Sequence, residues 1–163
     1  MRLLHKIGNK LNENYNTREE ILSCNEPLSF DGVYLSVYEN RDILLGKDVT
    51  LFVMGDYVGG DNSFDFGQPY EMLCSWEQID ELVKDYGCKL GWHTWSHPDL
   101  TKMDNFEEIL NEVTPPRRMK YFAYPYGRFD KTVVEAVEMA GFKEAYSVHQ
   151  GDGSEFKRNR EYL

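Results

Sequence analysis

The feature that most constrains the fold is an alternation of short apolar runs with segments of helical periodicity. The clearest run, Val49 to Met54, is nearly continuous and rich in β-branched and aromatic residues, which is typical of a fully buried strand. Shorter runs of this kind occupy residues 27–31, 88–92, 119–124 and 145–148. Because helical segments separate these runs, the order predicts a parallel sheet with right-handed crossovers, an α/β fold.

Helices are predicted over residues 33–45, 75–86, 105–113 and 130–140. Ser75 can cap the second of these, with Gln78 at the capping-box position, and Thr17 precedes an acidic turn in the same way. In the polar N-terminal region, the spacing of Leu3, Leu4, Ile7 and Leu11 favours a short amphipathic helix. We therefore expect an N-terminal polar and helical extension over residues 1–26, packed on a main domain over residues 27–163.

Composition narrows the class of protein and its surroundings. A net charge of −10 argues against a nucleic-acid backbone or an anionic membrane surface as partner. The three cysteines, Cys24, Cys74 and Cys88, fit no zinc ribbon, and three reduced thiols in a reducing compartment are the simplest interpretation. The N-terminus has no apolar run of signal-peptide length, so we expect a cytoplasmic protein without a membrane span. Nothing in the sequence indicates an oligomeric state.

Two histidines carry the clearest chemical signal. His93 and His97 lie four positions apart, so on a helical turn both imidazoles could reach one metal ion, although two surface histidines at this spacing also arise by chance. Pro98 interrupts regular structure directly after them, which places the pair where a strand opens into a loop. Asp31 and Gly32 end an earlier strand, and they are equally consistent with a site carboxylate or a simple turn.

Three separated blocks resemble the polysaccharide deacetylases of the NodB-homology group, in the order in which that family carries them. The family shows a T/S-F-D-D-G block, an H-T/S-x-x-H block and an R/A-x-P-Y/F-G block. The corresponding blocks here are Ser29-Phe30-Asp31-Gly32, His93-Thr94-Trp95-Ser96-His97 and Ala123-Tyr124-Pro125-Tyr126-Gly127. The resemblance covers about residues 27–148.

The resemblance implies a distorted (β/α) barrel with a divalent metal, most often zinc, that polarises an acetyl carbonyl and activates water. In the family, the two histidines and one Asp hold the metal, the other Asp accepts the proton of the water, and a peptide N–H of the third block supports the oxyanion. These roles imply His93, His97 and Asp31 as metal ligands, and Asp31 and the backbone of Tyr126 as catalytic groups. A metal-bound water with a pKa near ~7 makes this chemistry feasible.

The chain departs from the family pattern at the metal site. An alignment without a gap places Asp31 on the proton-accepting Asp and Gly32 where the metal-binding Asp belongs. Either Asp31 turns to ligate the metal, or the metal site is degenerate and the protein binds its ligand without turnover. Ala123 also stands where many members carry an Arg that orients the base.

The family's late His, on a Leu-x-His strand, has no evident match near the end of the chain. His149 lies in a polar context that indicates a surface loop, and His5 is interpreted as a surface residue. With so little chain after residue 148, we expect a barrel that is short of strands.

The sequence therefore predicts an enzyme that hydrolyses the amide bond of an N-acetylated sugar in a glycan or glycan precursor. The alternative is a degenerate, deacetylase-like carbohydrate-binding protein, and a weaker third possibility is a metal-binding structural domain. The aromatic and turn residues expected to contact the acetylated saccharide are Tyr124, Pro125, Tyr126 and Trp95.

Overall fold

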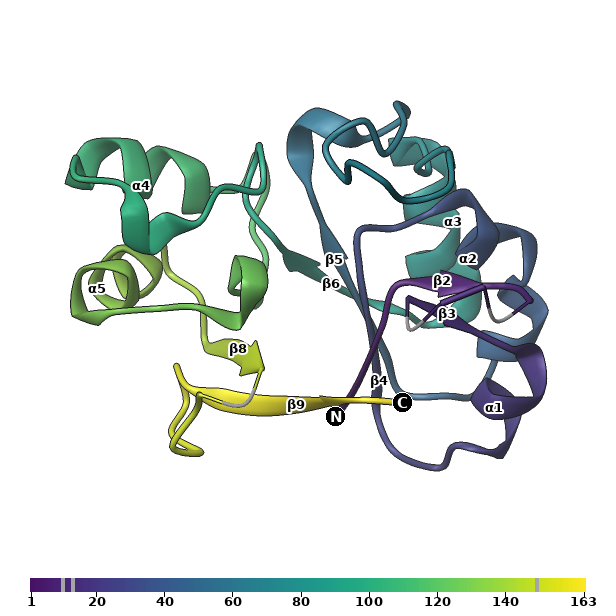
Figure 1. Cartoon of the computed structure of the whole chain (residues 1–163). Helices are drawn as coiled ribbons and strands as arrows, with labels where there is room; N and C mark the ends of the chain where they lie inside the picture. Colours follow the sequence, from purple (N-terminus) through teal and green to yellow (C-terminus); the bar gives the residue numbers. More distant parts are fainter. Residues whose placement is uncertain (10, 13, 149) are drawn as a thin grey trace.

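The computed structural model describes residues 1–9, 11–12, 14–148 and 150–163. Its centre is a closed barrel of parallel strands in the order β1-β4-β5-β6-β7-β8-β9 (Figure 1). The strands are β1 (Arg2–Leu4), β4 (Leu28–Asp31), β5 (Val49–Val53), β6 (Lys89–Trp92), β7 (Tyr121–Ala123), β8 (Glu144–Val148) and β9 (Arg158–Tyr162). Every neighbouring pair runs parallel, so the predicted (β/α) barrel is confirmed.

Among the described residues, five α-helices follow the strands, with α1, α2 and α3 on one side of the barrel and α4 and α5 on the other (Figure 1). They are α1 (Arg18–Ser23), α2 (Leu35–Glu39), α3 (Trp76–Tyr86), α4 (Phe106–Val113) and α5 (Lys131–Met139). The N-cap predicted at Thr17 and the capping box predicted at Ser75 are both present, and Thr17 forms a capping box as well. No helix in the described part of the chain has the length and apolarity needed to cross a bilayer.

The core lies between the helices and the barrel wall. All five residues of β5 are buried, as the continuous apolar run predicted. Inside the barrel, Phe52, Ala123 and Tyr146 form a small cluster of their own. The three cysteines are free thiols, in agreement with the sequence interpretation.

The N-terminal region differs from the prediction. The amphipathic helix inferred from Leu3, Leu4 and Ile7 is wrong, because these residues belong to β1 and to β2 (Lys6–Ile7). The strand β2 pairs with β3 (Tyr15–Asn16) in a separate two-stranded sheet. Leu3 and Leu4 are both buried because β1 pairs with its neighbouring strands. Their helix-like spacing to Ile7 therefore does not reflect a helix.

β1 and β9 close the barrel that the sequence predicted to be short of strands. β1 pairs with β4 on one side and with β9 on the other, so residues 1–26 are not an extension packed on a separate domain. The two chain ends consequently lie close together in Figure 1. β9 reads Arg-Asn-Arg-Glu-Tyr, and Arg160 is its one buried residue, so no apolar run marks it as a strand.

Candidate active site at the carboxyl ends of the strands

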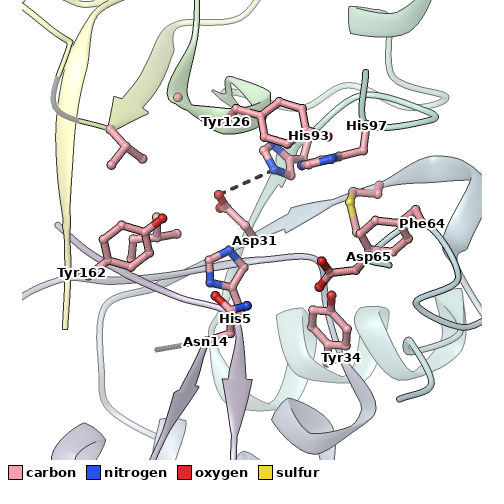
Figure 2. Close-up of a pocket in the computed structure, with 14 residues that line it drawn as sticks. His5, Asn14, Asp31, Tyr34, Phe64, Asp65, His93, His97, Tyr126 and Tyr162 are labelled. Carbon is pink, nitrogen blue, oxygen red and sulfur yellow. Dashed lines mark ion pairs between the residues drawn. The ribbon is translucent and has the colours of Figure 1, made fainter. Parts of the chain in front are cut away.

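One cavity of about 440 Å³ opens where the parallel strands end. Asp31 is the last residue of β4, His93 follows β6, Tyr126 follows β7, and His5 follows β1. All four line this cavity, together with His97 (Figure 2). The carboxyl ends of barrel strands are where barrel enzymes carry their active sites, because loops from several strands converge there.

Asp31 is held by an arginine from the far end of the chain. Arg160 Nη1 donates to Asp31 Oδ1 at 2.5 Å, and Nη2 donates to Oδ2 at 2.8 Å. Arg160 is fully buried, its guanidinium lies 5.1 Å from the ring centroid of Phe52, and Asp31 is only 7% exposed. Burial alone would raise the pKa of Asp31, but the charges of Arg160 and His93 and the hydrogen bonds from Arg160 outweigh it and lower the pKa. Asp31 is therefore a carboxylate at neutral pH.

His93 faces this carboxylate. Its Nδ1 lies 2.7 Å from the carbonyl oxygen of Ala123, and because a carbonyl only accepts, Nδ1 carries the proton. Burial is the main cause that lowers the pKa of His93, so the ring is neutral at pH 7. Nε2 is then unprotonated and lies 3.6 Å from Asp31 Oδ2 (dashed line in Figure 2). The ring thus directs a lone pair at the carboxylate.

His97 completes an aromatic wall beside His93. Its ring centroid is 4.8 Å from that of His93 and 4.8 Å from that of Tyr126. Burial lowers the pKa of His97 to about 3. The loop is held in a rare conformation, since Thr94 and His97 both have positive φ, and His97 N donates to Thr94 Oγ1 at 3.0 Å.

Glu112 on α4 fixes the same loop. One carboxylate oxygen accepts from the backbone N–H groups of Trp95 and Ser96, both at 3.0 Å, and the other accepts from Ser96 Oγ at 2.7 Å. These bonds satisfy backbone groups of an irregular segment that would otherwise need water. The position of His97 therefore depends on α4 as well as on β6.

The third block contributes two residues to the cavity surface, Tyr126 and Gly127. Tyr126 has φ 58° and its ring is 60% exposed. Tyr124 is fully buried, and its hydroxyl donates to the carbonyl of Phe156, so it packs in the core. Pro125 is buried, and Trp95 lies outside the cavity, with its Nε1 donating to the carbonyl of Thr114. Of the four predicted saccharide contacts, the structure places Tyr126 at the cavity.

Sequence reasoning missed two site residues, Arg160 and His5. The interpretation of His5 as a surface residue is wrong, because it lines the cavity, its Nδ1 is buried without a hydrogen-bond partner, and burial lowers its pKa to about 4. Leu3-Leu4-His5 matches the Leu-x-His strand that the family carries late in its sequence, although here it lies at the start of the chain. Since β1 lies beside β9, a strand at either end of the sequence can fill this place. His149 lies outside the described residues.

The residues present do not fit a three-ligand metal. Gly32 has φ +68°, and a Cβ built on it would lie 2.8 Å from Met54 Cε and 3.1 Å from a ring carbon of Tyr34. Across the described ranges, no group of three or more His, Cys, Asp or Glu side chains is arranged to hold a metal ion. His93, His97 and Asp31 share a cavity without forming such a group, so their predicted ligation stays a prediction and no reaction step is derived through a metal.

A buried carboxylate and imidazoles at the mouth of a closed parallel barrel define the class as a parallel barrel with a candidate active site at the carboxyl ends of its strands. The family model described as polysaccharide deacetylase matches residues 28–145. The chain belongs to the polysaccharide deacetylase family.

Solved structures of the same fold agree with this assignment. A Streptococcus pyogenes deacetylase, PplD, in complex with acetate superposes with a TM-score of 0.73 at 17% identity, covering 100% of this chain and 92% of that one. IcaB from Ammonifex degensii superposes with a TM-score of 0.74 at 18% identity, covering 99% and 91%. An uncharacterised 30.6 kDa protein of Geobacillus stearothermophilus is 26% identical over 132 residues, which is 73% of this chain and 44% of that protein. The chain thus spans less than half the length of this curated relative.

Proposed function

We propose that this protein removes acetyl groups from an acetylated sugar of a glycan or glycan precursor. The observation that carries the proposal is the Asp31 carboxylate, paired with Arg160 and facing His93 at the mouth of the barrel. A cytoplasmic location, and with it a precursor as substrate, is part of the same proposal.

In the proposed reaction, Asp31 accepts the proton of a water that attacks the acetyl carbonyl. The same proton then passes to the leaving nitrogen or oxygen as its bond to the acetyl carbon breaks, so that acetate and the deacetylated sugar are released. Arg160 is a positioning residue, because it holds both carboxylate oxygens and keeps the group ionised over the physiological pH range. The pair also fixes the direction of the carboxylate, which a mobile side chain would lose. Asp31 is thus oriented before substrate arrives.

The other side chains are placed for the carbonyl and the leaving group. The peptide N–H of Tyr126 supports the oxyanion in this proposal, and its turn is fixed by hydrogen bonds from Gly127 N and Arg128 N to preceding carbonyls. His5 is a neutral ring that can donate a hydrogen bond to the leaving nitrogen or oxygen. The exposed ring of Tyr126 offers an apolar face to the sugar.

The charge of the site disfavours an anionic substrate. Arg160 balances Asp31, burial keeps His93 and His97 neutral at pH 7, and Asp65 adds a further carboxylate to the lining. A neutral acetylated hexosamine enters such a cavity without an unpaired charge, whereas a phosphorylated sugar would bring one.

Acetate release from N-acetylglucosamine oligomers tests the proposal, in parallel with added zinc and with chelator. We expect Asp31→Asn to lower the rate by about 10²- to 10⁴-fold, the range for loss of a general base. Asp80→Asn, on an exposed ion pair with Arg117, is the matched control and should leave the rate unchanged. Undiminished acetate release by Asp31→Asn would contradict the assignment of the base.

A second candidate is a deacetylase-like protein that binds an acetylated saccharide without turnover. Gly32 favours it, because a family carboxylate is missing there and side chains crowd its place. It predicts calorimetric binding of the oligomers with no acetate release, and Tyr126→Ala would weaken that binding. Detectable turnover that Asp31→Asn abolishes would decide against this candidate.

A further inference from the structure

We propose that the cleft retains no resident divalent metal, and that the Asp31–Arg160 pair and an apolar wall formed by Met54 and Tyr34 stand in place of the metal centre. This proposal concerns the same cleft as the proposed function. It is tested by the metal content and metal affinity of the protein, which are independent of acetate release. Three observations on the described residues carry it.

The place of the missing carboxylate is crowded by the end of the Met54 side chain and by the Tyr34 ring. Any side chain at residue 32 must start from a backbone with φ +68°, which non-glycine residues seldom adopt. Its Cβ would meet the methyl of Met54 at 2.8 Å and the Tyr34 ring at 3.1 Å. Both residues line the cavity, so an apolar surface faces the position from which a carboxylate ligand would project.

Asp31 is already engaged as the partner of Arg160, which takes up one lone pair on each carboxylate oxygen. Both of its oxygens accept hydrogen bonds from Arg160, and a turn toward a metal would break this bidentate pair. The guanidinium would be left in the barrel interior, where its Nε is already without a partner. A buried charge without its counter-charge is strongly unfavourable, so the ion pair opposes any such rotation.

One further carboxylate, Asp65, lines the cavity, but it does not complete a ligand set. Figure 2 shows its carboxylate beside the Tyr34 hydroxyl. Within the described residues, it joins no group of three potential ligands. Two neutral imidazoles alone supply neither the third ligand nor the negative charge that a tight divalent site uses.

The test is the metal content of the purified full chain by elemental analysis, followed by titration with zinc and with cobalt. We expect less than roughly one tenth of an equivalent in the native protein and no saturable site below micromolar zinc, because two of three protein ligands do not make a structural or catalytic zinc site. One equivalent of metal that is lost in His93→Ala/His97→Ala would overturn the proposal. Adding Asp65→Asn then shows whether that loop supplied the ligand, which would overturn it equally.

A gain-of-binding variant tests the steric argument. Gly32→Asp/Met54→Ala restores the carboxylate and removes the methyl that it would meet, and Met54→Ala alone is the matched control. We expect zinc affinity at least roughly 10- to 100-fold higher in the double variant than in the control, because losing even a hydrogen-bond partner of a metal ligand lowers metal affinity by this factor. If the double variant folds and binds zinc no better than Met54→Ala, the crowded carboxylate position is not what excludes metal, and the proposal fails on this arm.

Acetate release from the same preparations separates this proposal from the proposed function. Chelator-insensitive release by a metal-free protein supports both. A metal-free protein without release leaves this inference standing and rejects the hydrolase, whereas release that needs one bound equivalent of metal rejects this inference alone.

Discussion

Replacing Arg160 by methionine should be among the most damaging single changes to this protein. The guanidinium is fully buried, donates two hydrogen bonds to Asp31 and lies over the ring of Phe52. Methionine keeps most of the apolar volume but leaves the Asp31 carboxylate buried without its partner. Breaking a buried pair in this way costs about 3–5 kcal/mol of unfolding free energy. For a chain of this length, that corresponds to a fall in melting temperature of roughly 6–20 °C.

Urea denaturation at several pH values is the assay. In the Arg160→Met protein, burial without a counter-charge raises the pKa of Asp31, so the native state takes up a proton before the unfolded state does. The unfolding free energy of this variant should therefore fall furthest below that of the wild type near pH 7, and the difference should shrink as the pH falls toward ~4. The double variant Asp31→Asn/Arg160→Met removes both charges and should recover to within about 2 kcal/mol of the wild type.

An exposed ion pair provides the control. Arg117 Nη2 lies 2.7 Å from Asp80 Oδ1, and the two side chains are 41% and 56% exposed. Arg117→Met should therefore change stability by less than about 1 kcal/mol, with little dependence on pH. If Arg160→Met were no more damaging than Arg117→Met, or if its deficit did not shrink at low pH, the electrostatic account of the barrel interior would be refuted.

Three further outcomes follow from the same contacts. The wild-type unfolding free energy should fall as the pH drops below ~4, because the lowered pKa of Asp31 stabilises the fold only while the group is ionised, and Asp31→Asn should show a shallower fall in acid titrations followed by circular dichroism. Glu112→Ala should cost about 2–3 kcal/mol in urea denaturation, because it removes three hydrogen bonds to Trp95 and Ser96, and it should also slow acetate release by displacing His97. His5→Gln should slow acetate release by about 10²-fold or more while changing stability by less than about 1 kcal/mol, since Nδ1 of His5 makes no hydrogen bond to lose; equal loss of both would indicate a structural role.

Local patterns predicted the parts of the fold that are defined locally. The run at residues 49–54 gave β5, and the capping residues at Thr17 and Ser75 gave the starts of α1 and α3. β1 and β9 were missed because each is stabilised by pairing with a strand from the other end of the chain, and that partnership leaves no periodic signal.

The site residues likewise fall into those that short motifs mark and those that only the fold brings together. Asp31 and the histidine pair stand in short motifs and could be found from the sequence. Arg160 is 129 residues from Asp31 and sits in a polar strand, so only the closed barrel shows that the two meet. Whether a histidine such as His5 faces solvent or a cavity depends on the neighbouring strand, which the sequence did not place.

The interior position of Arg160 raises the question of which strands can deliver a guanidinium to Asp31. Ala123, at the end of β7, is fully buried in the same interior cluster as Phe52. It also aligns with the position at which many members of the family carry an Arg. An arginine at any inward-facing position near the carboxyl ends of the strands should be able to pair with Asp31, because these ends meet at one mouth of the barrel.

Moving the arginine tests this directly. In Ala123→Arg/Arg160→Met, the new guanidinium restores a positive charge to the barrel interior, and we expect it to recover about half of the 3–5 kcal/mol lost in Arg160→Met. Ala123→Met/Arg160→Met is the matched control, since it adds comparable bulk without charge. Recovery that is greater for arginine than for methionine at pH 7, and that disappears near pH 3 as Asp31 in the control becomes protonated, would show that the charge matters and its strand of origin does not. Equal stability of the two double variants at both pH values would mean that Asp31 requires the geometry of β9 itself.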